Sequence, residues 1–345
     1  MVRWEFWPRW ALNPPVVVWV LLLGLRHRCL SLFSAVNPSI PSGGFLGESK
    51  MDILRGLAPA GERIARTGFV AFHESPDERL KSLRASMNEL NLRLPVVLKP
   101  DAGHRGSAVK VIRTEKQLRS YIQHARFPFL VQEYVSGLEF GVFYYRFPHQ
   151  KTGRIFSITE KRFPSVVGDG ISTVEELILQ DERAVCLAQA YIDQNRQHAR
   201  RILDPGESLQ LVELGTHWRG SIFLDGGWLL TPALEEAIDA VAQTFEGFYF
   251  GRFDIRTRSA EDFQRGQHFK VLELNGVTSE STNIYDPNNS LFDAYRVLFK
   301  QWSIAFEIAR QNRSRGAAVV PASALFRQAL NYRHISRLFR NGSEL

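Results

Sequence analysis

The feature that most constrains the fold is a strand-like segment, residues 250–256, in which charged and apolar residues alternate. Successive side chains of a strand point to opposite faces. One face then carries Arg252, Asp254 and Arg256, and the other carries Phe253 and Ile255. Such alternation is typical of an antiparallel sheet with one face packed on a core. The chain is therefore expected to build a sheet whose second face is charged.

A second segment, residues 271–276, repeats this pattern. Glu273 and Asn275 would share the polar face, and Leu272 and Leu274 would face the core. If the two strands are neighbours, they present two carboxylates, an amide oxygen and an arginine to one cleft. Hard oxygen ligands of this kind suit Mg²⁺ shared between protein and phosphates. The alternative is an ordinary arginine–aspartate salt bridge on a half-exposed sheet, which explains either strand but not both.

A phosphate-binding loop is predicted where the apolar strand of residues 94–99 ends in Lys99. The loop that follows contains Arg105, Gly106 and Ser107. Glycines let backbone N–H groups approach phosphate oxygens, and the lysine and arginine supply positive charge. The spacing matches neither the P-loop nor the dinucleotide-binding glycine motif. A strand–loop–strand hairpin with a surface lysine would look similar.

A further nucleotide contact is predicted at residues 129–135, an apolar strand that stops at Gln132 and Glu133. Backbone groups up to Val135 would meet an adenine edge. Glu139, just beyond the next turn, would accept hydrogen bonds from both ribose hydroxyls. The alternative is a hairpin with ordinary surface carboxylates.

Taken together, residues 94–286 resemble the ATP-grasp superfamily, especially D-alanine–D-alanine ligase and the amide-ligase part of cyanophycin synthetase. The resemblance implies an α+β chain with the ATP-grasp fold, in which two α/β subdomains with mainly antiparallel sheets clasp ATP. It also implies a Mg²⁺- and ATP-dependent ligase that joins a carboxylate to an amine through an acyl-phosphate, with Mn²⁺ able to replace Mg²⁺. The alternatives are an ATP-grasp kinase that stops at phosphorylation and a non-catalytic nucleotide-binding membrane scaffold.

The resemblance assigns roles by position. The catalytic residues would be Arg252 and Lys161, and the metal ligands Asp254, Glu273 and Asn275. The nucleotide contacts would be Lys99, Arg105, Gly106, Ser107, Gln132, Glu133, Val135 and Glu139. The substrate contacts would be His217, Arg219 and Ser279, although an ordinary loop histidine explains His217 equally well.

Four regions are expected along the chain. They are an apolar and aromatic segment (1–50), a helical lead-in (51–93), the catalytic domain (94–311) and a basic tail (312–345). The lead-in stands where ATP-grasp ligases usually carry a full preceding domain. Residues 37–50, rich in Pro, Gly and Ser, are either a linker or a loop over the site to which Glu48, Ser49 and Lys50 supply polar groups. A long helix is expected after Thr173.

The amino-terminal segment contains an uncharged run, residues 11–25, closed by Arg26 and Arg28. The run is shorter than the roughly 20 apolar residues that span a bilayer. Trp4, Trp7 and Trp10 precede it. Tryptophan and arginine flanks fit a segment lying in a membrane interface, so residues 1–34 are expected to contact a membrane surface. A signal peptide fits less well because of Glu5, and the remaining alternative is a helix docked on the enzyme.

The formal charge of +7 suits an anionic partner such as a nucleotide, an acidic substrate or a lipid surface. No zinc-finger spacing and no basic region with a heptad occurs, so nucleic acid is not expected as a partner. Cys29 and Cys186 give no disulfide framework, which favours a reducing compartment. Because ATP is cytoplasmic, the enzyme is expected in the cytoplasm, peripheral on the inner membrane face. Its substrates would be a small-molecule or peptide acid and amine, and the resemblance also implies a homodimer.

Overall fold

The computed structural model describes all residues except 1–3, 5–6, 8, 103–107, 213–220 and 342–345, with the backbone alone at residues 9 and 332–341. The chain divides into two compact units. One comprises residues 1–160 and 225–345, and the other residues 161–224. The α+β class predicted from the sequence is confirmed, because helices accompany sheets that are mainly antiparallel.

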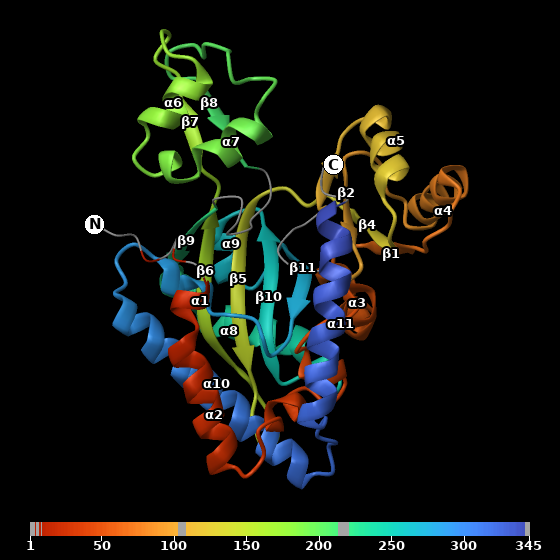
Figure 1. Ribbon diagram of the computed structural model, residues 1–345, viewed down its shortest axis with the longest axis vertical. Coiled ribbons are helices and arrows are strands. Elements are labelled where there is room, and N and C mark those ends of the chain that lie inside the picture. Colours follow the sequence, from red (N-terminus) through yellow and green to blue (C-terminus); the bar gives the residue numbers. More distant parts are fainter. Residues whose placement is uncertain (1–3, 5–6, 8, 103–107, 213–220, 342–345) are drawn as a thin grey trace. The chain divides into compact units, whose positions relative to one another are not determined.

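The first unit contains a four-stranded antiparallel sheet of order β1-β4-β2-β3 (Figure 1). Its strands are β1 (Thr67–Val70), β2 (Val96–Pro100), β3 (Lys110–Ile112) and β4 (Phe129–Glu133). Two helices with strong amino-terminal caps share its core, α4 (Pro76–Glu89) and α5 (Glu115–His124). Ser75 caps α4, and Thr114 forms a capping box with Gln117 at the start of α5. The lead-in is thus not purely helical as predicted, since it also supplies β1.

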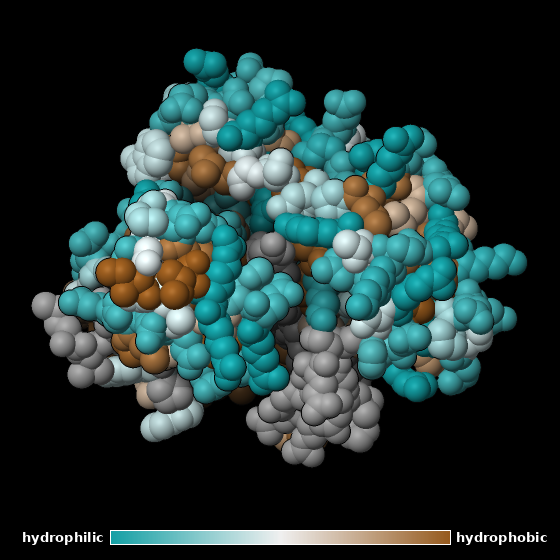
Figure 2. Space-filling view, turned by 90° about the horizontal axis from the view of Figure 1, so that it is seen from above, coloured by the Kyte–Doolittle hydropathy of each residue, from teal (hydrophilic) through white to brown (hydrophobic). Residues whose placement is uncertain are grey.

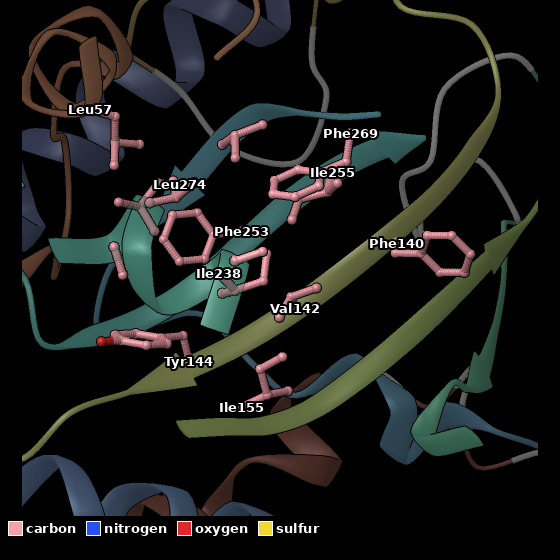
Figure 3. Packing of buried hydrophobic residues seen from close by; sticks show 14 of the residues in the cluster. Leu57, Phe140, Val142, Tyr144, Ile155, Ile238, Phe253, Ile255, Phe269 and Leu274 are labelled. Atoms are coloured by element: carbon pink, nitrogen blue, oxygen red, sulfur yellow. The ribbon is translucent and has the colours of Figure 1, made fainter. Parts of the chain in front are cut away.

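The larger sheet has the order β11-β10-β5-β6-β9. Its strands are β5 (Leu138–Tyr145), β6 (Arg154–Arg162), β9 (Ile222–Asp225), β10 (Phe250–Thr257) and β11 (Phe269–Asn275). One face is covered by α8 (Pro232–Gln243), which is capped by Thr231 and contributes Ile238 to the core (Figure 3). In that figure Phe253 and Ile255 of β10 point into the same apolar cluster as Phe140 and Val142 of β5. The predicted apolar face of residues 250–256 is confirmed.

A further core is built by the long helix α10 (Leu291–Ser314) together with α2 (Pro14–Arg26) and η2 (Leu32–Ala35). The short helix α1 (Arg9–Leu12) contacts α2. Ser290 and Asp293 form a capping box at the start of α10. The indole of Trp19 stacks on Phe299 at 5.1 Å and donates to its carbonyl oxygen at 3.0 Å. The alternative interpretation, in which the amino-terminal helix docks on the rest of the chain, is thus confirmed for one of its faces.

After α2 the chain runs through η3 (Pro41–Gly43), α3 (Lys50–Leu57) and η4 (Ala58–Arg63). Asn37 is fully buried at the start of this stretch. Its Oδ1 accepts from the backbone N–H groups of Tyr249 and Phe250, and its Nδ2 donates to the Phe250 carbonyl at 2.8 Å. One amide side chain therefore ties the amino-terminal segment to the start of β10.

Shorter elements complete the first unit. They are η7 (Gly227–Leu229), α9 (Ala260–Gln264), η8 (Thr282–Tyr285) and α11 (Ala322–Asn341). None of the helices described is both long and apolar enough to cross a lipid bilayer. On the face drawn in Figure 2, hydrophilic side chains predominate and hydrophobic ones gather in separate patches.

The second unit packs a two-stranded antiparallel sheet, β7 (Ser165–Val167) and β8 (Ser208–Gln210), with three short helical segments around its own core. These are α6 (Val174–Gln180), η5 (Ala184–Leu187) and α7 (Ala188–Gln194). The long helix predicted after Thr173 is therefore wrong. Asp181 ends it, because its extended backbone breaks the helix and its carboxylate accepts from the N–H groups of Arg183 and Ala184.

Candidate nucleotide and metal site

The two alternating segments form neighbouring antiparallel strands, β10 and β11. Arg252 lies opposite Asn275, and Asp254 lies opposite Glu273. All four side chains are partly buried on the polar face of the sheet. The Arg252 guanidinium pairs with the Asp254 carboxylate, with 3.1 Å between Nε and Oδ1. The structure therefore brings together the four residues that the sequence predicts at this site.

A β-bulge interrupts the ladder beside these residues. Asp254 pairs with Glu273, but the next residue, Ile255, pairs with Val271, so that Leu272 is skipped. The prediction that Leu272 faces the core is wrong, and Val271 is buried in its place. The extra residue shifts the alternation by one position and turns the Leu272 backbone out of the ladder.

Lys99 binds the backbone that the bulge exposes. Its Nζ donates to the Leu272 carbonyl at 3.0 Å and to Gln132 Oε1 at 3.1 Å. Only 5% of Lys99 is exposed. Burial lowers the pKa of Lys99 to about 8, although the nearby carboxylates of Glu273, Asp254 and Asp101 oppose this effect. The predicted phosphate lysine is thus held beside β11. An anion bound there would raise the pKa of Lys99 again and keep its ammonium group protonated.

Gln132, on β4, binds the same Leu272 carbonyl as Lys99 and also reaches β1. Its Nε2 donates to the Leu272 carbonyl at 3.0 Å and to Thr67 Oγ1 at 2.8 Å. The residue sits inside β4, which is paired with β1 and with β2. The side chain of Gln132 therefore orients Lys99, and the backbone after the strand end is better placed than Gln132 to meet a base.

The Arg252 side chain is fixed on two sides. Besides Asp254, it contacts the Glu280 carbonyl, which accepts from Nη1 at 3.0 Å. Burial would lower the pKa of Arg252, but the carboxylates of Asp254, Glu273 and Glu280 outweigh that effect and raise it. The guanidinium is therefore a permanent, preoriented positive charge.

The carboxylates of the predicted nucleotide hinge are buried and paired, so their interpretation as ordinary surface groups is wrong. Glu139 pairs with Arg256 at 3.0 Å, and both side chains are less than one-tenth exposed. Arg256 also donates to the Val135 carbonyl at 2.8 Å. Glu133 binds Arg66 and Lys270. Burial favours its protonated form, but these hydrogen bonds outweigh burial and lower the pKa of Glu133.

The amino-terminal segment lies along β11, the strand that carries Glu273 and Asn275. The Gly43 carbonyl accepts from the backbone N–H of Val277 at 3.0 Å. Gly44 and Gly276 cross so closely that a Cβ on either would lie within 2.6 Å of the other's Cα. Lys50 Nζ is 3.7 Å from Glu273 Oε1. Residues 43–50 therefore pack against β11 and the turn after it and are not a free linker.

The same segment reaches the strand that carries Lys99. Asp101 Oδ1 accepts from the Ser49 hydroxyl at 3.0 Å and from the Met51 backbone N–H at 2.9 Å. Ser49 also caps α3. A small pocket forms between the segment and β11, and its lining residues are Gly47, Glu48, Lys50, Ile53, Glu273, Leu274 and Asn275.

Comparison with known proteins finds similar solved structures but no similar sequence family. No family model matches this chain, and no curated protein matches it. Among solved structures, D-alanine–D-alanine ligase from Bacillus anthracis matches 78% of this chain and 69% of its own, with 15% identity and a TM-score of 0.42. VanG D-Ala:D-Ser ligase from Enterococcus faecalis matches 76% of this chain and 61% of its own, with 13% identity and a TM-score of 0.40.

A third match is the ATP-grasp ligase PsnB, complexed with its minimal precursor, with 14% identity, 73% of this chain, 59% of that chain and a TM-score of 0.38. The chain is similar to ATP-grasp ligases. The chain spans only 36% of the bifunctional glutathione synthetase from Pasteurella multocida that it also matches. What the chain does is therefore argued from its own side chains.

The sequence predicted Glu48 only as a polar group of a loop and did not indicate that its carboxylate would be buried. Its Oε2 is buried and has no hydrogen-bond partner among the described residues. Burial raises the pKa of Glu48, and Glu273 adds to this effect while Lys50 opposes it. The available signal was a polar Glu-Ser-Lys sequence directly after a glycine-rich stretch. A buried carboxylate oxygen without a partner, beside β11, is suited to a cationic ligand.

The remaining predicted site residues lie elsewhere in the structure or outside its described part. Ser279 is buried, and its hydroxyl donates to the Gly276 carbonyl at 2.6 Å, so it shapes the turn after β11. Lys161 is buried in the second unit. The predicted residues Arg105, Gly106, Ser107, His217 and Arg219 lie outside the described part of the chain.

The donor set fits a Mg²⁺ ion that is shared with phosphates. Asp254, Glu273 and Asn275 offer two carboxylates and an amide oxygen, which are hard ligands. Within the described residues, no group of three or more His, Cys, Asp or Glu forms a closed metal cage. An ion held here would take its remaining ligands from phosphate oxygens and water, as Mg²⁺ commonly does.

Proposed function

We propose that this chain is an ATP-grasp ligase that uses Mg²⁺ and ATP to join a carboxylate to an amine through an acyl-phosphate. The observation that carries the proposal is the contact of Lys99 with the carbonyl of Leu272, the residue before Glu273. The predicted phosphate lysine and the predicted metal carboxylate thereby meet on one stretch of backbone. A sheet built only for stability would not need a buried lysine there.

In the proposed reaction the substrate carboxylate attacks the γ-phosphoryl group of ATP, and ADP leaves. The amine then attacks the acyl-phosphate carbon, phosphate leaves, and the amine loses a proton. Phosphoryl transfer needs little covalent chemistry from the protein, so positioning and charge neutralisation dominate. Lys99 and Arg252 would offset charge on the phosphate oxygens, assisted by Lys161. When bound to Asp254, Glu273 and Asn275, Mg²⁺ would neutralise further phosphate charge.

The nucleotide base would lie against the backbone that follows β4. Arg256 fixes this backbone, because it binds both Glu139 and the Val135 carbonyl. Glu139 would accept hydrogen bonds from the ribose hydroxyls while it remains paired with Arg256. The loop residues Arg105, Gly106 and Ser107 would complete the phosphate contacts.

The amino-terminal segment would supply acceptor contacts in place of the preceding domain that ATP-grasp ligases usually carry. Glu48 would bind the ammonium group of the amine substrate, since its buried carboxylate oxygen otherwise lacks a partner. Lys50, beside Glu273, would help orient the acid. His217, Arg219 and the turn at Ser279 complete the proposed substrate contacts.

The proposal is tested by ADP release with Mg²⁺ and ATP, against pools of amino acids, dipeptides and hydroxy acids. Release should depend on an added acid–amine pair and fall at least about 100-fold in Glu273→Gln, the loss expected when a transition-state charge contact is removed. Glu246→Gln, on an exposed glutamate outside the site, is the matched control. Normal turnover by Glu273→Gln contradicts the metal assignment.

Mass spectrometry of the products separates the alternatives. An amide with one phosphate released per ADP supports the ligase. A stable phosphorylated acid formed without any amine indicates a kinase instead. Tight ATP binding with no turnover in any pool indicates a nucleotide-binding scaffold.

A further inference from the structure

The helix α2 has two apolar faces, of which α10 covers only one. On the covered face, Trp19 packs against Phe299, and Leu23 is buried in the core that α2 shares with α10. These contacts fix how the helix is rotated about its axis. The direction of its other face is therefore determined by the fold.

The uncovered face of α2 consists of apolar residues alone up to Arg26. Its aliphatic residues are between 48 and 65% exposed, and they are Val17, Val18, Leu21, Leu22 and Leu25. Pro14 and Pro15 are exposed beside them. At about 100° per residue these positions cover roughly half of the helix circumference. A contiguous exposed apolar surface of this kind marks an interaction site rather than ordinary surface.

The ends of this face carry groups typical of a membrane interface. Trp10 is 79% exposed at the amino-terminal end, and Trp7 is exposed before it. Arg26 and Arg28 are exposed at the carboxy-terminal end. Tryptophan and arginine prefer the boundary between acyl chains and headgroups, where one part of the side chain is apolar and the other is hydrated.

The sequence segment that contains this face, between Glu5 and Glu48, carries charge of only one sign. Residues 6–47 contain no Asp or Glu, and four of the seven tryptophans of the chain lie in residues 1–19. An anionic lipid surface complements such a segment. A second copy of the chain docked face to face would bring no acidic residue of this segment to Arg26 and Arg28. The absence of that complement favours lipid over self-association.

We propose that the exposed face of α2 is a docking surface for an anionic lipid bilayer. The helix has 13 residues and is about 20 Å long, too short to span a bilayer, so it lies in the plane of the headgroups. The aliphatic side chains enter the acyl region, and Arg26 and Arg28 contact lipid phosphates. This inference does not depend on the proposed ligase activity, and each can fail without the other.

The test is co-sedimentation of the full chain with vesicles of phosphatidylcholine, with and without phosphatidylserine. The wild type should bind the anionic vesicles more tightly, and the preference should shrink with added salt. Leu21→Glu with Leu25→Glu should weaken binding at least about tenfold, since both side chains would enter the acyl region. Arg26→Glu with Arg28→Glu should remove the preference for anionic vesicles, because each arginine contributes roughly fivefold.

Matched controls keep the result interpretable. Ile171→Glu with Leu179→Glu changes two exposed apolar residues of the second unit and should bind like the wild type. Thermal melting checks that every variant folds. Equal binding by the α2 variant and the wild type overturns the proposal, and so does failure of the wild type to bind either vesicle. A dimer that dissociates in the α2 variant, without vesicle binding, assigns the face to a second copy instead.

Discussion

Lys99 Nζ lies 3.0 Å from the carbonyl oxygen of Leu272, the residue skipped by the bulge between β10 and β11. An ordinary ladder would have used that carbonyl within the sheet. The bulge frees it, and Lys99 and Gln132 both bind it. A single inserted residue thus connects the smaller sheet to the strand that carries Glu273. The arrangement also explains why Lys99 remains buried before any phosphate is bound.

Nucleotide affinity is expected to fall as the pH rises above about 8. Burial lowers the pKa of Lys99 to about 8, and phosphate oxygens bind its ammonium form. Because binding raises that pKa, free Lys99 must take up a proton above pH 8, and affinity should drop by up to about tenfold per pH unit. Titration of ATP between pH 7 and 9.5 checks this. Lys99→Arg should bind independently of pH over this range, whereas Lys116→Met, on an exposed lysine, should keep the wild-type profile.

Glu48→Gln is expected to stabilise the protein and impair its activity. The fold raises the pKa of Glu48 above its ordinary value of 4.5. Above its ordinary pKa, ionisation of Glu48 therefore lowers the free energy of unfolding. The loss disappears at low pH, where the group is protonated in both the folded and the unfolded state. The variant should melt at a higher temperature than wild type at pH 8 but not near pH 4. Its KM for the amine should rise at least about tenfold, as expected for loss of a charged contact.

If the variant is more stable but its KM for the amine is unchanged, burial of Glu48 costs stability without serving substrate binding. That result would contradict the proposed contact of Glu48 with the amine. Glu246→Gln, on the exposed surface, should change neither quantity. Thermal melts at both pH values and initial rates at varied amine concentration give the two readouts.

Removing one partner of the buried Glu139–Arg256 pair should be strongly destabilising. Glu139→Ala would leave a buried guanidinium uncompensated, which typically costs about 3–5 kcal/mol of unfolding free energy. The double variant Glu139→Leu with Arg256→Met should recover much of that loss. Urea unfolding of the single and double variants measures the coupling. The exposed pair Glu307–Arg310 should show a coupling below about 1 kcal/mol. Equal couplings for the two pairs would contradict the predicted effect of burial.

Gly276→Ala should destabilise the protein and weaken ATP turnover together. The added methyl would lie 2.6 Å from Gly44 Cα and 2.7 Å from the Gly43 carbonyl oxygen, and no side-chain rotation can relieve a clash with backbone. Overpacking of this kind costs about 1–3 kcal/mol, and the shift would displace Asn275. Melting temperature and initial rate are the measurements. Gly227→Ala is the control, since its nearest neighbours lie at 3.5 Å or beyond. Unchanged values for both measurements would contradict the close crossing.

Local patterns predicted much of the fold because they report local physics. The helix start at Thr173 follows from a side chain that caps its own backbone. The polar face of β10 follows from alternation along one strand. The bulge at Leu272 could not be predicted in this way, because one extra residue changes the register only relative to a partner strand. The pairing of Glu139 with Arg256 depends likewise on which distant strands become neighbours.

The site was predicted unevenly for the same reason. Arg252, Asp254, Glu273 and Asn275 meet because two alternating strands pair. The orienting role of Gln132 depends on a carbonyl freed by the bulge, and the approach of Glu48 depends on the glycine crossing at Gly44. Neither contact leaves a local trace in the sequence. The short second unit was hidden because Asp181 ends its helix with an ordinary turn contact.

The bonds of Asn37 also set the order in which the protein can be completed on the ribosome. Asn37 and Phe250 are 213 positions apart, and at 5–20 residues per second the later partner is made roughly 10–40 s after the earlier one. During that delay α2 has been synthesised but α10, which covers one of its apolar faces, has not. The nascent chain therefore exposes both faces of α2, and β10 is joined to the amino-terminal segment only after Phe250 has been synthesised.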